Sequence, residues 1–401
     1  MKAAPIRPVK FPSTAHRPCF FVPPIRHSHL KVYGKQGSLC PVDYFGDSRV
    51  QVFQQPAPPM PSTNRLRLLL ALLLFTASLG ATQTWQLSSP DGRLQLELEL
   101  QDGHLHYAVE RDGAAVLAPS RLGFTLDQDR QFYGNFAQAT VRYDSRDSEW
   151  KTVWGEAAQI RNHYHALIVN LRTTAGGALQ TEFRLFDDGL GFRYHFPRQP
   201  DLDEFQILEE HTEFNLTRDY RSWWIPSFNR ERYENAYRET QLSEVTGVET
   251  PFTLRSSEGL HLSFHEAALV DYPSMTLRRT GKHHLQAALY PWSNGVLVYA
   301  RAPMHSPWRT ILMSDDAAGL VESRLMLNLN EPNRLADTSW IKPGKYIGIW
   351  WEMHLGLATW GPGPELGATT ENAMKYIDFA AEHRFDGVLI EGWNIGWEGD
   401  W

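Results

Sequence analysis

A two-residue alternation of apolar and polar side chains governs most of this sequence from Trp85 onward. It is clearest at 93–101, where leucine fills every second position and charged or amide side chains fill the positions between. Successive side chains of a β-strand point to opposite faces, so this alternation is typical of strands with one buried face. Asp102-Gly103 then provides a turn before the next run. The pattern therefore predicts consecutive antiparallel strands.

Similar segments recur along the chain and are separated by clusters of glycine, aspartate and proline. They lie at 167–171, 181–186, 191–196, 261–264, 295–300 and 325–330. Each such strand buries one face and needs a second sheet to cover that face. We predict a large antiparallel β-sandwich over residues 82–341.

The pattern changes at Lys342-Pro343-Gly344. A continuous apolar run at 346–351 suits a parallel strand that is buried on both faces. After a Gly/Pro-rich loop at 361–364, apolar residues at helical spacing predict a helix over 371–383, and 388–390 reads as a second strand. One βαβ unit is expected, and the fold class is β plus α/β.

Such a unit is how a (β/α)8 TIM barrel begins, and a complete barrel takes about 250 residues. The segment 342–401 is much shorter, so we expect it to be the truncated start of a barrel. Two parallel strands and one helix cannot cover their own apolar faces. Either a partner completes the barrel, or the chain is a fragment.

The first eighty-one residues have a different character. Eleven of the 25 prolines lie within residues 1–61, and we expect 1–59 to be disordered and to be a mis-assigned upstream extension. Residues 60–81 have the pattern of a signal peptide: two arginines, an apolar run at 68–75 and then small residues. That run is too short to span a bilayer, so we expect export to the periplasm without a stable membrane span, with a membrane anchor as the alternative.

Composition narrows the possible partners. The chain has 42% hydrophobic and 21% charged residues, which suits large cores, and a formal net charge of −7. Because the first 81 residues are basic, the remainder is more acidic still. An acidic body without a basic stripe argues against nucleic acid and favours a neutral substrate or a cation. Motifs of serine hydrolases, zinc proteases and nucleotide-binding proteins do not occur.

Seven of the fourteen tryptophans lie within the last 62 residues, and several stand near the ends of the two predicted parallel strands. The carboxyl ends of barrel strands carry the active sites of such enzymes. Aromatic rings beside a carboxylate suit a sugar, which offers C–H faces for stacking and hydroxyl groups for hydrogen bonds. The tryptophans that follow these strands, together with Glu391, are therefore candidates for a sugar pocket. The alternative is that these tryptophans only pack the core.

A second candidate site is the acidic segment Glu209-Glu210-His211-Thr212-Glu213. On a strand, Glu209, His211 and Glu213 would share one face, while Glu210 would point to the other. Neighbouring carboxylates are ligands for a hard cation such as Ca²⁺. From spacing alone, a solvated acidic edge is the favoured interpretation and a metal site the alternative.

Several long motifs occur in the order in which glycoside hydrolase family 97 has them. They are Asp188–Tyr194, Glu209–Thr212, Trp224–Pro226, Pro307–Ile311, Leu327–Pro332, Lys342–His354, Gly367–Asn372, Tyr376–Glu382 and Phe385–Asn394. On these motifs the chain resembles that family over residues 85–401. The resemblance implies a β-supersandwich followed by a catalytic TIM barrel, exo-acting α-glucosidase or α-galactosidase activity on α-linked oligosaccharides, and a periplasmic location.

The resemblance also implies a calcium ion at the active site. It favours Glu210 as a ligand from the sandwich, with Glu209 as the alternate, and it places Trp350, Trp351, Glu391 and Trp393 around the sugar. The family's catalytic acid and base come from later barrel strands, so they are expected beyond Trp401 and this chain alone is expected to be inactive. Two alternatives remain: a non-catalytic carbohydrate-binding module, and a truncated product that does not fold stably.

Overall fold

The computed structural model describes residues 82–200, 202–228 and 235–391. The expected extension at 1–59 and the expected signal peptide at 60–81 lie outside these ranges, as does Trp393. Within the described part of the chain, no helix is long and apolar enough to cross a membrane.

The first large sheet has eight antiparallel strands. In spatial order they are β1 (Gln83–Ser88), β2 (Leu94–Gln101), β3 (His104–Arg111), β4 (Ala114–Leu122), β12 (Glu213–Leu216), β19 (His284–Leu289), β18 (Met275–Arg279) and β15 (Gly247–Glu249). The alternation at 93–101 is confirmed, because the leucines of β2 are buried. Asp102 and Gly103 form the turn to β3 with positive φ angles, as the sequence predicts.

The second large sheet has ten strands. In spatial order they are β14 (Arg238–Gln241), β13 (Arg221–Trp224), β16 (Phe252–Arg255), β17 (His261–Ala267), β22 (Trp308–Ser314), β10 (Gly189–Phe196), β9 (Ala178–Phe186), β8 (Gln159–Thr173) and β7 (Phe136–Lys151), while β21 (Met304–His305) also pairs with β10. A four-stranded sheet contains β20 (Val298–Arg301), β11 (Glu204–Glu210), β5 (Phe124–Leu126) and β6 (Gln131–Phe132). A 3₁₀ turn, η1 (Leu242–Glu244), follows β14.

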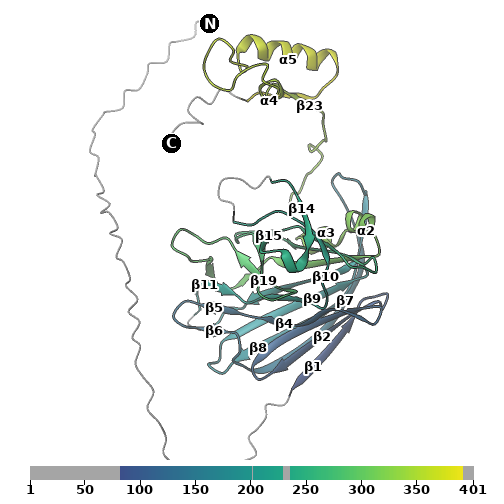
Figure 1. The fold of residues 1–401 in the computed structure, drawn as a ribbon, viewed down its shortest axis with the longest axis vertical. Helices are drawn as coiled ribbons and strands as arrows, with labels where there is room; N and C mark the ends of the chain where they lie inside the picture. Colours follow the sequence, from purple (N-terminus) through teal and green to yellow (C-terminus); the bar gives the residue numbers. More distant parts are fainter. Residues whose placement is uncertain (1–81, 201, 229–234, 392–401) are drawn as a thin grey trace, which may run out of the picture. The chain divides into compact units, whose positions relative to one another are not determined.

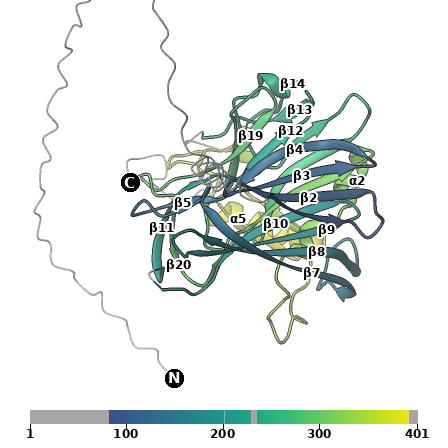
Figure 2. The same cartoon turned by 90° about the horizontal axis from the view of Figure 1, so that it is seen from below.

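The two large sheets face each other across one hydrophobic core. Figures 1 and 2 show β2–β4 in one layer and β7–β9 in the other. Aromatic rings meet between the layers: the ring centroids of Tyr107 and Phe192 are 5.1 Å apart, and those of Phe214 and Phe264 are 5.4 Å apart. The predicted antiparallel sandwich is therefore confirmed, because each sheet buries its apolar face against the other.

Two short helices, α2 (Ala317–Glu322) and α3 (Leu325–Leu329), belong to a second, smaller core that includes residues of β8, β17 and β22. The expected strand at 325–330 is wrong, because this segment is helix α3. Leu325 and Leu329 lie one helical turn apart and are both buried in the small core. Leu329 packs so close to β10 that a Cβ on Gly191 would lie 2.4 Å from its Cδ1 atom.

The segment after residue 342 forms one βαβ unit, as the sequence predicts. The strands β23 (Tyr346–Gly348) and β24 (Gly387–Leu389) are parallel, and α5 (Thr370–Glu382) lies between them in sequence. Thr369 caps α5, because its side chain accepts a hydrogen bond from the Asn372 N–H group. The first strand is shorter than expected: it ends at Gly348, and α4 (Trp351–His354) begins three residues later. The barrel itself stays a prediction.

Candidate functional site

The acidic segment lies where β11 ends and β12 begins. Glu209 is exposed, Glu210 is buried, and His211 is partly buried, so the expected alternation across the two faces is confirmed. On the outer face, the Glu209 Oε1 atom lies 3.7 Å from His211 Nδ1. The Glu213 carboxylate accepts hydrogen bonds from the Arg121 Nη2 and Nε atoms at 2.7 and 3.0 Å. This face is a partly neutralised surface edge.

The inner face of the segment leads to a buried charge network around Arg309, a residue of β22. Arg309 donates to both carboxylate oxygens of Glu210, at 2.9 and 2.7 Å, and to Glu266 Oε2 at 2.8 Å. The side chains of Arg309 and Glu210 are fully buried, and that of Glu266 is 4% exposed. Thr212 and Tyr272 donate further hydrogen bonds to Glu210. Such bidentate, charge-assisted bonds are what a buried carboxylate requires.

Electrostatics keep this network charged. Burial alone would lower the pKa of Arg309, but the adjacent Glu210 carboxylate raises it, so the guanidinium stays protonated. Burial raises the pKa of Glu266, and the nearby Arg309 charge opposes that rise. Two carboxylates share one guanidinium here. The cluster therefore has a net negative charge when both carboxylates are ionised.

The geometry bears on the choice of metal ligand. Both Glu210 oxygens already accept hydrogen bonds from the Arg309 cation, which would repel a second cation, so Glu210 does not fit the role that the resemblance favours for it. Glu209 is half exposed and can offer its carboxylate. In the described ranges, no group of three or more His, Cys, Asp or Glu side chains is placed to hold a metal ion. The calcium site stays a prediction.

The structure brings Trp350 and Trp351 into an aromatic cluster. The ring of His354 lies 5.2 Å from those of both Trp350 and Trp360, and the Trp350 and Trp351 rings are 5.3 Å apart. Trp351 is 57% exposed, so it is available for a ligand. Because Gly348 of β23 pairs in parallel register with Leu389 of β24, Trp350 and Glu391 follow the same edge of the small sheet. Their role in sugar binding stays a prediction.

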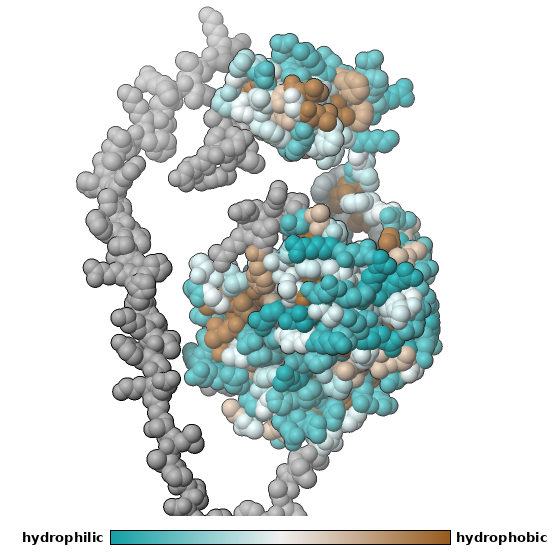
Figure 3. Space-filling model, in the orientation of Figure 1, coloured by the Kyte–Doolittle hydropathy of each residue, from teal (hydrophilic) through white to brown (hydrophobic). Residues whose placement is uncertain are grey.

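Sequence reasoning missed a cavity of about 1180 Å³ in the sandwich, which we call the Trp292 pocket. Strands of both large sheets contribute to it: β15, β18 and β19 belong to the first sheet, and β17 belongs to the second. Its lining residues are Phe228, Glu249, Thr250, His265, Glu266, Leu269, Ser274, Met275, Tyr290, Pro291, Trp292, Ser293 and Gly295. Of these, Leu269 is exposed, as is the neighbouring Val270 beyond the pocket, and Figure 3 shows hydrophobic residues gathered beside β11 and β19.

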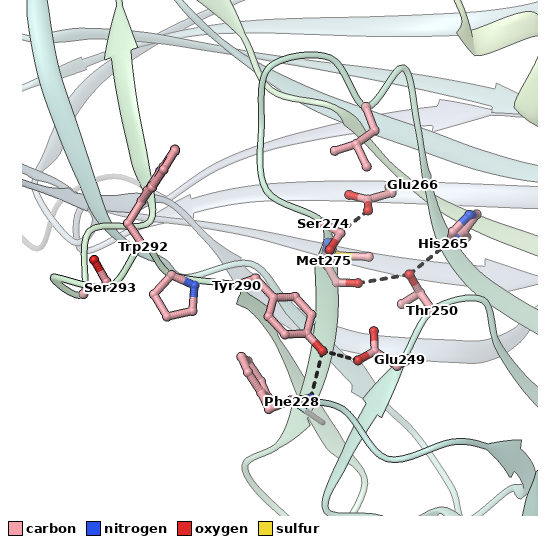
Figure 4. A pocket seen from close by; sticks show the side chains of 13 residues that line it. Phe228, Glu249, Thr250, His265, Glu266, Ser274, Met275, Tyr290, Trp292 and Ser293 are labelled. Carbon is pink, nitrogen blue, oxygen red and sulfur yellow. Dashed lines mark hydrogen bonds between the residues drawn. The ribbon is translucent and has the colours of Figure 1, made fainter. Parts of the chain in front are cut away.

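Hydrogen bonds fix the polar side of this pocket, as Figure 4 shows. The Tyr290 hydroxyl donates to Glu249 Oε1 and accepts from the Phe228 N–H group at 2.9 Å. The Thr250 hydroxyl donates its proton to the Met275 carbonyl oxygen at 3.0 Å. The His265 Nδ1 atom, 3.0 Å from that hydroxyl, must therefore be the donor in its own contact with Thr250.

This assignment determines what His265 offers to a ligand. Burial lowers the pKa of His265, so the imidazole is neutral near pH 7. With its proton on Nδ1, the Nε2 atom is an acceptor. No short motif could have revealed this pocket, because its residues come from segments up to 67 positions apart and from two sheets.

Comparison with known proteins covers most of the chain. A sequence model described as Glycosyl-hydrolase 97 N-terminal matches residues 87–332, and one described as Glycoside hydrolase 97 matches 350–401. A retaining alpha-galactosidase of Bacteroides thetaiotaomicron is 26% identical over 84% of this chain and 54% of its own length. A probable retaining alpha-galactosidase of Streptomyces bingchenggensis is 25% identical over 82% and 50%.

Among solved structures, a Glycoside Hydrolase Family 97 enzyme from Pseudoalteromonas sp. strain K8 is 42% identical, with a TM-score of 0.76 over 79% of this chain and 48% of that one. It was solved in complex with acarbose and, as a variant, with panose. The chain thus spans about half the length of the relatives it matches.

Proposed function

Because this chain belongs to glycoside hydrolase family 97, we propose that it is part of an exo-acting α-glycosidase that hydrolyses α-linked oligosaccharides, with α-glucosides as the favoured substrates. The observation that carries this proposal is the 42% identity to the Pseudoalteromonas enzyme, whose complexes hold acarbose and panose. The curated relatives with galactosidase names are more distant, at 26% and 25% identity. α-Galactosides are therefore the second substrate class to test.

Hydrolysis of a glycosidic bond requires more carboxylates than the candidate site of this chain provides. Hydrolysis of a glycosidic bond uses two carboxyl groups that flank it, about 5–5.5 Å apart for retention and about 6.5–9.5 Å apart for inversion. Glu391 is one exposed carboxylate on the edge of the small sheet. We propose that the acid and base lie in the part of its relatives that this chain does not span, and that the 401-residue chain is inactive alone.

Within this proposal, the residues of the chain bind and orient the sugar. Trp351, exposed at the edge that Glu391 shares, offers a face on which a pyranose can stack. A calcium ion, as the family resemblance implies, would supply positive charge next to the substrate. Glu209 is the sandwich carboxylate that fits as a ligand, and the remaining ligands would come from other parts of the protein. Export to the periplasm belongs to the same proposal, because residues 60–81 have the pattern of a signal peptide.

The test compares this chain with a version extended to the length of its relatives. We expect the extended protein to release monosaccharide from p-nitrophenyl α-glucoside faster than from the α-galactoside, and the 401-residue chain to release none. Activity should fall after treatment with EDTA and return with added Ca²⁺. If the extended protein hydrolyses neither substrate, the proposal is wrong. If its activity is unchanged by EDTA, the calcium component of the proposal is wrong.

A further inference from the structure

We propose that the Trp292 pocket is a sugar subsite of the sandwich, in which Trp292 stacks on one pyranose unit of a neutral oligosaccharide. This inference rests on the proposed function, because it assigns the same class of substrate to a second place in the chain. Figure 4 shows Trp292 on one side of the pocket and Thr250, Glu249 and His265 on the other. A ring placed between them would meet an aromatic face and a polar wall.

The exposure of Trp292 is the first argument. Its side chain is 63% exposed although it belongs to a loop beside a cavity. A ligand that covers the exposed indole ring removes apolar surface from water, which is favourable. A pyranose has C–H groups on its faces, and an indole ring provides a large flat surface for them.

The second argument is that the loop holds Trp292 in place without a ligand. The Trp292 N–H group donates to the Val296 carbonyl oxygen, and the Gly295 N–H group donates to the Trp292 carbonyl oxygen, which closes a tight turn. The Trp292 ring packs edge-on against Tyr299, with centroids 6.0 Å apart, and the Tyr299 hydroxyl accepts from Asn294 at 2.6 Å. A platform that is already ordered costs little entropy on binding.

The third argument is the chemistry of the opposite wall. His265 lines this wall with an imidazole whose Nε2 atom is an acceptor, and the Glu249 carboxylate accepts a hydrogen bond from the Tyr290 hydroxyl on Oε1. Sugar hydroxyl groups donate hydrogen bonds to such acceptors. Among the described residues that line the cavity, the charged ones are the acidic Glu249 and Glu266, so this wall favours a neutral sugar over a phosphorylated or carboxylated one. A neutral sugar is the ligand that fits.

The cavity is large enough for more than one sugar unit. Its volume of about 1180 Å³ exceeds the roughly 300–1,000 Å³ of ordinary small-molecule sites. The pocket is therefore suited to a unit of an oligosaccharide chain rather than to an enclosed monosaccharide.

The experiment is a binding titration of the 401-residue chain with maltotriose and panose by calorimetry. We expect Trp292→Ala to weaken binding by about tenfold, which corresponds to about 1.4 kcal/mol. Trp292→Phe keeps an aromatic face and should restore part of the affinity. Trp154→Ala is the matched control, because Trp154 is also 63% exposed but does not line the pocket. Its affinity should equal that of the unaltered chain.

Three results would overturn the subsite: no binding of either sugar, unchanged binding by Trp292→Ala, or an equal loss in Trp154→Ala. These outcomes are separable from the failure of the proposed function. If the extended protein hydrolyses α-glucosides while Trp292→Ala binds sugar normally, the proposed function is supported and the proposed subsite is refuted. If the extended protein hydrolyses neither substrate while Trp292→Ala loses sugar binding and Trp154→Ala does not, the proposed subsite is supported and the proposed function is refuted.

Discussion

Arg309→Met would remove the guanidinium that neutralises two buried carboxylates. Arg309 makes three charge-assisted hydrogen bonds, two to Glu210 and one to Glu266, and all three side chains are nearly inaccessible to water. Removing one partner of a buried ion pair costs about 3–5 kcal/mol, because the remaining charge has no compensation. A domain of this kind is stable by about 5–15 kcal/mol. We therefore expect a folded but strongly destabilised protein.

The assay is equilibrium unfolding in urea, followed by tryptophan fluorescence. The exposed pair of Arg301 and Glu204 provides the control, since both side chains are more than two-thirds exposed, and Arg301→Met should change the unfolding midpoint very little. Adding Glu210→Gln to Arg309→Met removes one stranded charge and should recover part of the stability. If Arg309→Met unfolds at the same urea concentration as the unaltered chain, or if the double variant is no better than the single one, the network does not stabilise the sandwich as argued.

The pH dependence of the same variant gives a second check. Without Arg309, the charge that opposes the effect of burial on Glu266 is lost, so the folded-state pKa of Glu266 lies further above the unfolded value of about 4.3. The folded state then holds protons that the unfolded state has lost, so stability falls as pH rises through this window. The penalty of Arg309→Met should thus be smallest below about pH 4 and largest near pH 7. A penalty that grows on acidification would contradict this account.

Other substitutions test single contacts. Gly189→Ala should destabilise the sandwich by at least about 1–3 kcal/mol in urea unfolding, because Gly189 has φ +145° and an added Cβ would lie 2.3 Å from a carbonyl oxygen of β22; an unchanged midpoint would refute this. Burial, with Arg193 and His195, lowers the pKa of His305 to about 4, so its contribution to stability is lost as pH falls from about 6.5; His305→Phe should make unfolding less sensitive to acid, and an identical pH profile would be the contrary result. Gly348→Ala would place a Cβ 2.1 Å from the Trp350 Nε1 atom, so the near-ultraviolet circular dichroism of the aromatic cluster should change, and an unaltered spectrum would show that the cluster does not need this glycine.

The two-residue alternation was sufficient to predict strands of the sandwich, because the backbone of a strand points successive side chains to opposite faces. The alternation in β2 and in the acidic segment was therefore readable from the sequence. At 325–330 the same kind of alternation indicated a strand, yet Leu325 and Leu329 also have the i, i+4 spacing of a helix. Tertiary contacts decided in favour of the helix: the Asn328 side chain donates to the Arg161 carbonyl oxygen and accepts from Trp150.

The partners of the acidic segment could not be predicted in this way. Glu210 meets Arg309, which is 99 positions away, and Glu266 meets it from 43 positions away. A charge pattern within five residues indicates that carboxylates are close together, but it does not tell which cation neutralises them. Spacing alone left a solvated edge and a metal site open, and the structure added a third answer for Glu210, a buried ion pair.

That ion pair also connects the acidic segment to the Trp292 pocket. Glu266 receives Arg309 on its Oε2 atom and accepts the Met275 N–H group on Oε1 at 2.9 Å, and both Glu266 and Met275 line the cavity. The Met275 carbonyl oxygen in turn holds Thr250, which orients His265. A chain of hydrogen bonds thus runs from Glu210 in the core through Arg309, Glu266 and Met275 to Thr250 and His265 on the pocket wall. Arg309 does not line the cavity, but it holds Glu266, which does. The pocket wall should therefore loosen when Arg309 is lost.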